Sequence, residues 1–198
     1  MNEQHWLLLI LWTLYCVIHS TLADIRIKSK FQTLMGNYYK YYRIGYSIFA
    51  ALTLAMILYF QISIPGKVLF HLPYLQYAVG SVLTLPGAYI MIICVRKYFY
   101  ELSGIQVLDH KEQKTSLRQD GVHSLVRHPL YFGTLLFVFG LLMFWPLLSN
   151  LIACIVIFIY TIIGVEHEEK QLNLEFGEAY RDYAERVPGL FPRILGKK

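Results

Sequence analysis

The sequence has little charge and few cysteines, and both shortages exclude common classes of protein. Only 16% of its 198 residues are charged and 56% are hydrophobic, whereas a soluble domain usually carries about 25% charged residues. The composition therefore excludes an ordinary soluble domain. Three cysteines, Cys16, Cys94 and Cys154, lie far apart inside apolar segments. They match neither a disulfide framework nor a metal-binding motif, so we expect packing residues and no metal site.

Internal repeats and low-complexity linkers are also lacking, and we expect no cleavable signal peptide. No basic residue precedes the first apolar segment, and no small-residue cleavage site follows it. The length and the absence of an internal linker predict a single membrane-embedded domain over residues 1–198.

Long apolar segments are abundant, each about as long as a crossing of a hydrocarbon layer of roughly 30 Å requires. We expect an all-α polytopic membrane protein with about five transmembrane helices and a cytoplasmic amphipathic C-terminal helix. The fourth span is short, so we expect it to be tilted or to form a shallow turn. The predicted spans are residues 6–23, 43–64, 73–95, 131–145 and 147–165.

Lys and Arg are distributed unevenly among the connecting segments. Five lie between the first two spans or, as Arg43 does, at the start of the second, six lie after the third and six in the tail, whereas Lys67 alone lies on the other side. Because basic residues favour the cytoplasmic side, this predicts an outside N-terminus and a cytoplasmic C-terminus. The basic residues trace membrane topology and form no compact patch, so the lipid bilayer is an expected partner. We expect no nucleic acid, and no obligate protein partner is evident.

Charged and titratable residues flank the last two spans. Arg127 and His128 stand directly before Pro129, which suits the first position of a helix. The unpaired amides of that helix start favour an anion, and Arg127 adds a forked cation. The alternative to an anion site is that Arg127 only extends to the membrane–water interface and Pro129 only begins a helix.

The last span ends in four titratable residues, Glu166, His167, Glu168 and Glu169. Carboxylates are disfavoured at a helix C-terminus, so they require a cationic or hydroxyl-rich partner, unless the helix simply continues into solvent. The hairpin between the last two spans brings this group to Arg127 and His128. The side of Arg127 and His128 would bind an anion, and the side of the glutamates would bind a cation and a diol. A zwitterionic amino-acid cofactor needs both.

The tail is predicted to continue as an amphipathic helix that lies across the cytoplasmic mouth and packs its aromatic residues inward. The alternative is an interfacial helix that rests on lipid. Pro188 and Pro192 are expected to end regular structure. The helical stripe consists of Glu169, Asn173, Phe176, Tyr180 and Tyr183.

Three runs of residues form one pattern: Gly121, Val126–Pro129, Tyr131 and Gly133; then Glu168-Glu169, Leu172, Phe176-Gly177, Tyr180 and Tyr183; and finally Val187-Pro188. Together they closely resemble the integral-membrane S-adenosylmethionine methyltransferases, which include isoprenylcysteine carboxyl methyltransferase and the phospholipid methyltransferases. A looser upstream match at His19-Ser20, Tyr42-Arg43 and Leu102–Gln106 resembles a small bacterial branch that contains methanethiol S-methyltransferases. This resemblance implies a bacterial inner membrane.

This resemblance implies that the cofactor is S-adenosylmethionine and that its binding part covers about residues 100–193. A lipophilic substrate would enter from the bilayer between spans. The residues implied to line or adjoin the cofactor site are His128, Tyr131, Glu168 and Glu169, with Arg127 and Gln106 near them.

We therefore expect methyl transfer to a lipophilic or small acceptor, either a thiol or a prenylcysteine carboxylate, at the cytoplasmic face. A thiol must lose its proton before it attacks, and His167 or His19 could accept it. Arg43 and Arg181 could steer an anionic substrate.

Three other functions stay open at this point. A phospholipid amine could be the acceptor. The chain could also be a nicotinamide-dependent membrane reductase, although five spans are few for one. A haem carrier would need two histidines facing each other at mid-membrane, but His19, His128 and His167 all lie near the cytoplasmic ends of spans.

Overall fold

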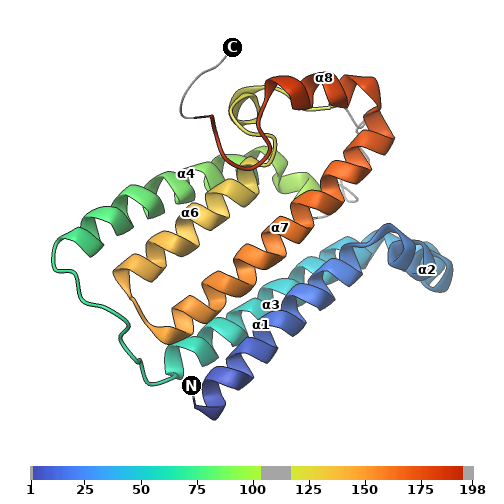
Figure 1. Cartoon of the computed structure of the whole chain (residues 1–198). Coiled ribbons are helices and arrows are strands. Elements are labelled where there is room, and N and C mark those ends of the chain that lie inside the picture. Colours follow the sequence, from blue (N-terminus) through green and yellow to red (C-terminus); the bar gives the residue numbers. More distant parts are fainter. Residues whose placement is uncertain (1, 104–116, 194–198) are drawn as a thin grey trace. The chain divides into compact units, whose positions relative to one another are not determined.

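The structure, a computed structural model, describes residues 2–103 and 117–193. Within these two ranges the chain forms α-helices and short 3-10 turns and no β-strand (Figure 1). A single isolated β-bridge there pairs Val68 with Leu147. The elements are α1 (Glu3–Ala23), α2 (Ile25–Met35), η1 (Gly36–Tyr41), α3 (Tyr42–Ser63), α4 (Leu75–Ser103), η2 (Gly121–Ser124), α6 (Pro129–Phe144), α7 (Leu148–Phe176) and α8 (Glu178–Arg186).

The prediction of an all-α polytopic membrane protein is confirmed. Four helical stretches of the described residues are long and apolar enough to cross a membrane, and the apolar parts of these stretches correspond to α1, α3, α4 and α7. The fourth predicted span is α6, which has 16 residues and is apolar but shorter than a full crossing requires.

Helix α2 is absent from the sequence-based prediction, which treated residues 24–42 only as a basic loop. Asp24 lies between α1 and α2 with an extended backbone, and its carboxylate accepts a hydrogen bond from the Arg26 N–H at 2.7 Å. This is the geometry of an N-cap, which gives a new helix its start. Gly36 then ends α2 with φ of +50°, a conformation that glycine adopts at little cost.

The described residues form two compact units, one of which includes α1, α2, α3 and the first turns of α7. In this first unit α1 and α3 lie side by side (Figure 1). Polar side chains join its helices inside the apolar region: Trp12 Nε1 donates to Gln61 Oε1, and Gln61 Nε2 donates to Asn150 Oδ1, both at 2.8 Å. Hydrogen bonds of this kind hold membrane helices together because an unpaired polar group in hydrocarbon is costly.

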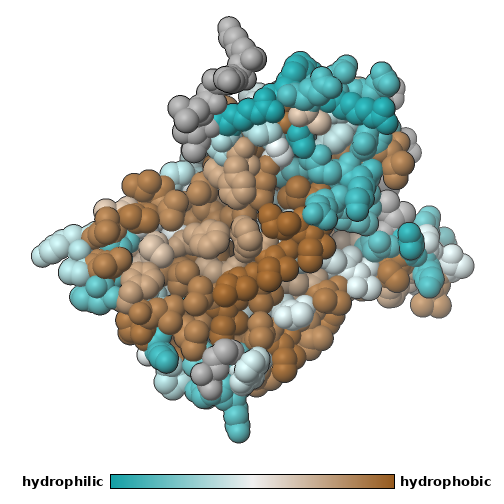
Figure 2. Space-filling view, viewed as in Figure 1, coloured by the Kyte–Doolittle hydropathy of each residue, from teal (hydrophilic) through white to brown (hydrophobic). Residues whose placement is uncertain are grey.

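The second unit includes α4 up to Lys97, α6, α7 from Ile157 and α8. Helices α4 and α6 approach closely because small residues face each other. A Cβ at Gly87 would lie 2.6 Å from the Phe137 backbone nitrogen, and one at Gly140 would lie 2.7 Å from the Thr84 nitrogen. Small residues permit such contacts between membrane helices. Figure 2 shows hydrophobic side chains over α6 and hydrophilic ones over α8. The prediction of a single domain is not tested by this division and stays a prediction.

Replacing Gly87 with alanine is expected to destabilise the protein by about 1–3 kcal/mol, because backbone atoms of α6 would have to move. Thermal unfolding of the detergent-solubilised protein measures this. Gly45→Ala is the matched control, since no atom lies within 4 Å of the Cβ it would add. A loss of equal size in both variants would contradict the close α4–α6 packing.

Candidate functional site

The polar residues before α6 and at the end of α7 meet in the second unit. Helix α6 begins at Pro129, as predicted, and His128 is its N-cap residue with a non-helical backbone. Proline at the first helical position fixes this start because its missing N–H would be unpaired there in any case. We name Arg127, His128, Glu168 and Glu169 the Arg127–Glu169 cluster.

Arg127 uses its guanidinium to bind both the end of α7 and the C-terminal segment. Its Nε and Nη2 donate to the two carboxylate oxygens of Glu169 at 2.9 and 2.8 Å. Its Nη1 donates to the carbonyls of Ala184 and Val187 at 2.9 and 2.7 Å. The Arg127 side chain is only 14% exposed. Such a bidentate pair is stronger and more directional than a simple ion pair.

His128 is the most buried member of the cluster and faces both glutamates. Its Nε2 donates to Glu169 Oε1 at 2.7 Å, and its Nδ1 lies 3.5 Å from Glu168 Oε2. The imidazole is 2% exposed, whereas the Glu168 side chain is 44% exposed. The predicted proximity of Arg127 and His128 to Glu168 and Glu169 is therefore present, and Glu168 is the member most accessible to a ligand.

Electrostatics favour the charged forms of the two basic residues. Burial works against the charged imidazole of His128, but hydrogen bonds and charges from Glu168 and Glu169 outweigh it and raise its pKa. Burial likewise opposes the Arg127 charge, and the hydrogen bond and charge of Glu169 more than offset it and raise its pKa. The cluster is thus a network of opposite charges in which each carboxylate has a basic partner.

The raised pKa of His128 predicts a pH-dependent stability. A group whose pKa is higher in the folded state stabilises folding fully below its unfolded pKa, and the contribution disappears as pH rises through the folded pKa. We expect thermal stability to fall as pH rises from about 6.5, the ordinary His value, through the folded pKa. The variant His128→Asn should lose this dependence and His71→Asn, at an exposed position, should keep it. A profile unchanged in His128→Asn would contradict the assignment.

The C-terminal segment completes the cluster through backbone contacts. The Arg127 N–H donates to the Pro188 carbonyl at 2.9 Å, and the His128 N–H donates to the Gly189 carbonyl at 3.1 Å. The tail reaches this position because Gly177, with φ of +55°, ends α7 and lets α8 start in a new direction. The predicted single helical stripe from Glu169 to Tyr183 was therefore wrong, since it is divided between two helices.

The aromatic residues of α8 nevertheless pack inward, as predicted. Tyr180 and Tyr183 are each 3% exposed, and the Tyr183 hydroxyl donates to the His123 carbonyl at 2.6 Å. The buried Tyr180 hydroxyl has no hydrogen-bond partner of standard geometry among the described residues. Burial and the nearby Glu169 carboxylate raise its pKa. Sequence reasoning included Tyr180 in the family pattern but assigned it no place in the site.

The structure brings Tyr131 to the Arg127–Glu169 cluster. Its ring centroid lies 5.9 Å from that of His128. A Cβ at Gly164 on α7 would lie 3.5 Å from the Tyr131 hydroxyl, an ordinary contact distance, so Tyr131 packs beside α7. Gln106, the sixth predicted cofactor residue, lies outside the described residues.

Of the four predicted catalytic residues, two belong to the second unit and two to the first. His167 is exposed and pairs with Gln171 Nε2 at 3.0 Å. Arg181 is 66% exposed and donates to Asn173 Oδ1 at 3.3 Å. His19 and Arg43 belong to the first unit, where the ring nitrogens of His19 lie 2.9 and 3.0 Å from the Tyr46 hydroxyl and Arg43 is exposed. Their catalytic roles stay predictions.

The arrangement suits an organic ligand that carries several charges. Because the His128 side chain faces the glutamates, it does not cap α6. The N–H groups of the first turn can therefore donate hydrogen bonds to a ligand carboxylate, and half-exposed Glu168 can accept hydrogen bonds from an ammonium or a diol. Among the residues that the structure describes, no three His, Cys, Asp or Glu side chains are arranged to hold a metal ion.

Comparison with known proteins identifies the family. The family model described as NnrU protein matches residues 7–191. The chain belongs to the NnrU protein family. No solved structure is significantly similar to this NnrU family member.

Three relatives of this NnrU family member have methyltransferase names. A methanethiol S-methyltransferase of Crocosphaera subtropica is 30% identical over 67% of the chain and 49% of the relative. Methanethiol S-methyltransferase 1 of Bradyrhizobium diazoefficiens is 28% identical over 93% and 65%. Protein-S-isoprenylcysteine O-methyltransferase B of Arabidopsis thaliana is 31% identical over 42% and 43%. The predicted resemblance to membrane methyltransferases is confirmed, and the chain spans about a third to two thirds of the length of the curated relatives it matches.

Proposed function

We propose that this NnrU family protein is an S-adenosylmethionine-dependent methyltransferase of the membrane. The observation that carries the proposal is the Arg127–Glu169 cluster. It joins a helix N-terminus, a buried imidazole and a half-exposed carboxylate at one place outside the apolar part of the helices. The methyltransferase names of the relatives support the same reaction class.

The residues present fit the cofactor by their chemistry. The amino-acid carboxylate would be held by the first-turn N–H groups of α6, and the ammonium or ribose diol by Glu168. Tyr131 and His128 would line the same place. Arg127 and Glu169 already bind each other. We therefore assign them a positioning role: they hold the end of α7, the start of α6 and the tail together so that Glu168 is correctly placed.

The bound cofactor supplies a methyl group on a positively charged sulfur. The chain's own contribution is to bind it, to align the acceptor and to exclude water, which together account for most of such a catalyst's effect. If the acceptor is a thiol, its proton must leave first. His167 or His19 would accept it under the proposal, and Arg43 or Arg181 would steer an anionic substrate.

We further propose a thiol or a prenylcysteine carboxylate as the acceptor, because the relatives' names specify a methanethiol and an isoprenylcysteine. The test is methyl transfer by the purified protein from radiolabelled S-adenosylmethionine to methanethiol, longer alkanethiols, a prenylcysteine and phosphatidylethanolamine. Labelled thioether or methyl ester supports the proposal. Label transferred only to the phospholipid amine would reassign the acceptor, and no transfer to any of them would contradict it.

The polar site would face the cytoplasm, with the N-terminus outside, in a bacterial inner membrane. The uneven distribution of Lys and Arg supports this orientation. Reporter enzymes fused to the C-terminus test it: one that is active only in the cytoplasm should work, and one that is active only outside should not. The reverse pattern would contradict the orientation.

A further inference from the structure

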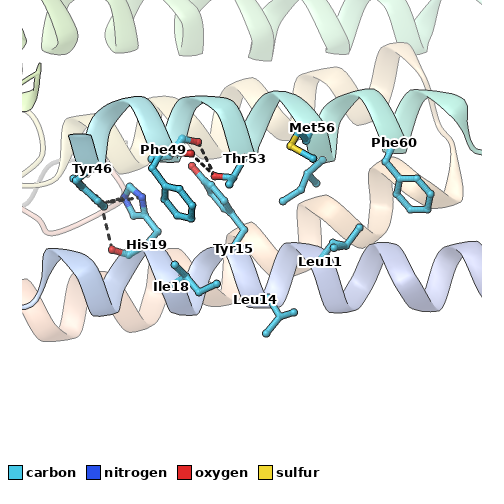
Figure 3. A pocket seen from close by; sticks show the side chains of 12 residues that line it. Leu11, Leu14, Tyr15, Ile18, His19, Tyr46, Phe49, Thr53, Met56 and Phe60 are labelled. Carbon is cyan, nitrogen blue, oxygen red and sulfur yellow. Dashed lines mark hydrogen bonds between the residues drawn. The ribbon is translucent and has the colours of Figure 1, made fainter. Parts of the chain in front are cut away.

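A second concave site lies in the first unit, between α1 and α3. We name it the α1–α3 groove. Its volume is about 380 Å³, which is in the range of small-molecule sites. No charged side chain lines it, and Figure 3 shows its wall formed from one stripe of each helix. The lining residues are Leu11, Leu14, Tyr15, Ile18 and His19 of α1, and Tyr46, Phe49, Ala50, Thr53, Met56, Ile57 and Phe60 of α3.

The groove is long and narrow. On α3 the lining runs from Tyr46 to Phe60, which at 1.5 Å per helical residue is roughly 20 Å. A volume of about 380 Å³ over that length leaves a mean cross-section of about 20 Å². One extended hydrocarbon chain fills such a cross-section.

The two ends of the groove differ in polarity. Leu11 and Phe60 lie at one end, and His19 and Tyr46 lie at the other (Figure 3). Thr53 adds little polarity between them, because its hydroxyl donates to the Phe49 carbonyl of its own helix at 2.8 Å. A ligand in the groove would therefore be apolar along its length, and a polar group on it would be placed at the His19 end.

His19 can bind that polar end. Its two ring nitrogens lie 2.9 and 3.0 Å from the Tyr46 hydroxyl, which also lies 3.2 Å from the His19 carbonyl. A neutral imidazole has one N–H and one acceptor nitrogen, and one tyrosine oxygen cannot engage both with good angles at once. The remaining nitrogen can bond a hydroxyl group of the ligand.

We propose that the α1–α3 groove binds a single-chain lipid with an uncharged, hydrogen-bonding head, as in a long-chain alcohol. The chain lies along Leu11, Ala50 and Phe60, and the hydroxyl bonds His19. A charged head is disfavoured because no ionised side chain in the groove could compensate it. The site is argued from the first unit alone and does not depend on methyl transfer.

The test uses hexadecanol that carries a diazirine and an alkyne, added to the purified full-length protein and irradiated. Labelled residues are then mapped by peptide mass spectrometry, so the wild-type protein tests the site without any variant. We expect label on the groove-lining residues of α1 and α3. Label found mainly outside them would overturn the proposal.

Two tryptophan variants and one competition experiment sharpen this test. Ala50→Trp should reduce labelling of the groove about tenfold, because the new ring fills it, whereas Ala51→Trp, at the exposed neighbouring position, should change it less than about twofold. Equal labelling of the two variants would contradict the site. Unlabelled hexadecanol should compete better than hexadecanoic acid, and His19→Phe should weaken competition by hexadecanol because the bond to its hydroxyl is lost. If hexadecanol and hexadecanoic acid competed equally in the wild type, the proposal of an uncharged ligand head would be wrong.

Discussion

Replacing Glu169 with glutamine is expected to destabilise the protein by about 3 kcal/mol and to abolish measurable binding of S-adenosylmethionine. The carboxylate accepts two hydrogen bonds from Arg127 and one from His128. Glutamine keeps the shape but removes the charge. Arg127, only 14% exposed, would then keep its charge without an anionic partner, and breaking such a pair costs several kcal/mol.

Thermal and denaturant unfolding of the purified protein measure the stability, and equilibrium dialysis with labelled cofactor measures the binding. The matched control is Glu178→Gln on α8, whose side chain is 93% exposed and lies 3.9 Å from Arg181. Such an exposed pair contributes little, so this variant should behave as the wild type does. If Glu169→Gln were as stable as Glu178→Gln, the Arg127–Glu169 cluster would not hold the fold together.

Glu168→Ala is expected to lose cofactor binding while it keeps the stability of the fold. Glu168 is 44% exposed and its carboxylate lies 3.5 Å from His128 Nδ1, so its loss should change the free energy of unfolding by less than about 1 kcal/mol. Cofactor affinity should nevertheless fall by about a hundredfold or more, because the carboxylate is proposed to bind the ammonium or diol directly.

The two variants together separate positioning from contact. Glu169 acts through Arg127 and His128, so its loss affects both stability and binding, whereas Glu168 affects binding alone. Normal cofactor affinity in a folded Glu168→Ala protein would remove Glu168 from the site. A large loss of stability in the same variant would show that its contact with His128 supports the fold.

Much of the site could be predicted from the sequence because its signals are local. Pro129 fixes the start of α6, and the short hairpin after it places that start beside the end of α7. The charge pattern then placed Arg127 and His128 opposite Glu168 and Glu169. The sequence could not show that Arg127 donates two further hydrogen bonds to the Ala184 and Val187 carbonyls. Every residue carries a backbone carbonyl, so such an acceptor cannot be recognised from the residue type.

The missed features depend on single backbone conformations. Gly177 adopts φ of +55° and divides the predicted tail helix, although Phe176, Tyr180 and Tyr183 have helical spacing across it. Asp24 caps α2 within a segment that the charge pattern identified only as a loop. The α1–α3 groove was not foreseen either, because its apolar residues are ordinary for membrane-spanning helices and only their three-dimensional arrangement leaves a cavity.

The most direct test of the central claim is equilibrium binding of labelled S-adenosylmethionine to the purified wild-type protein, with a nicotinamide cofactor as competitor. The account predicts saturable, stoichiometric binding that excess nicotinamide cofactor does not displace. Absence of saturable binding, or binding of the nicotinamide cofactor in its place, would contradict it.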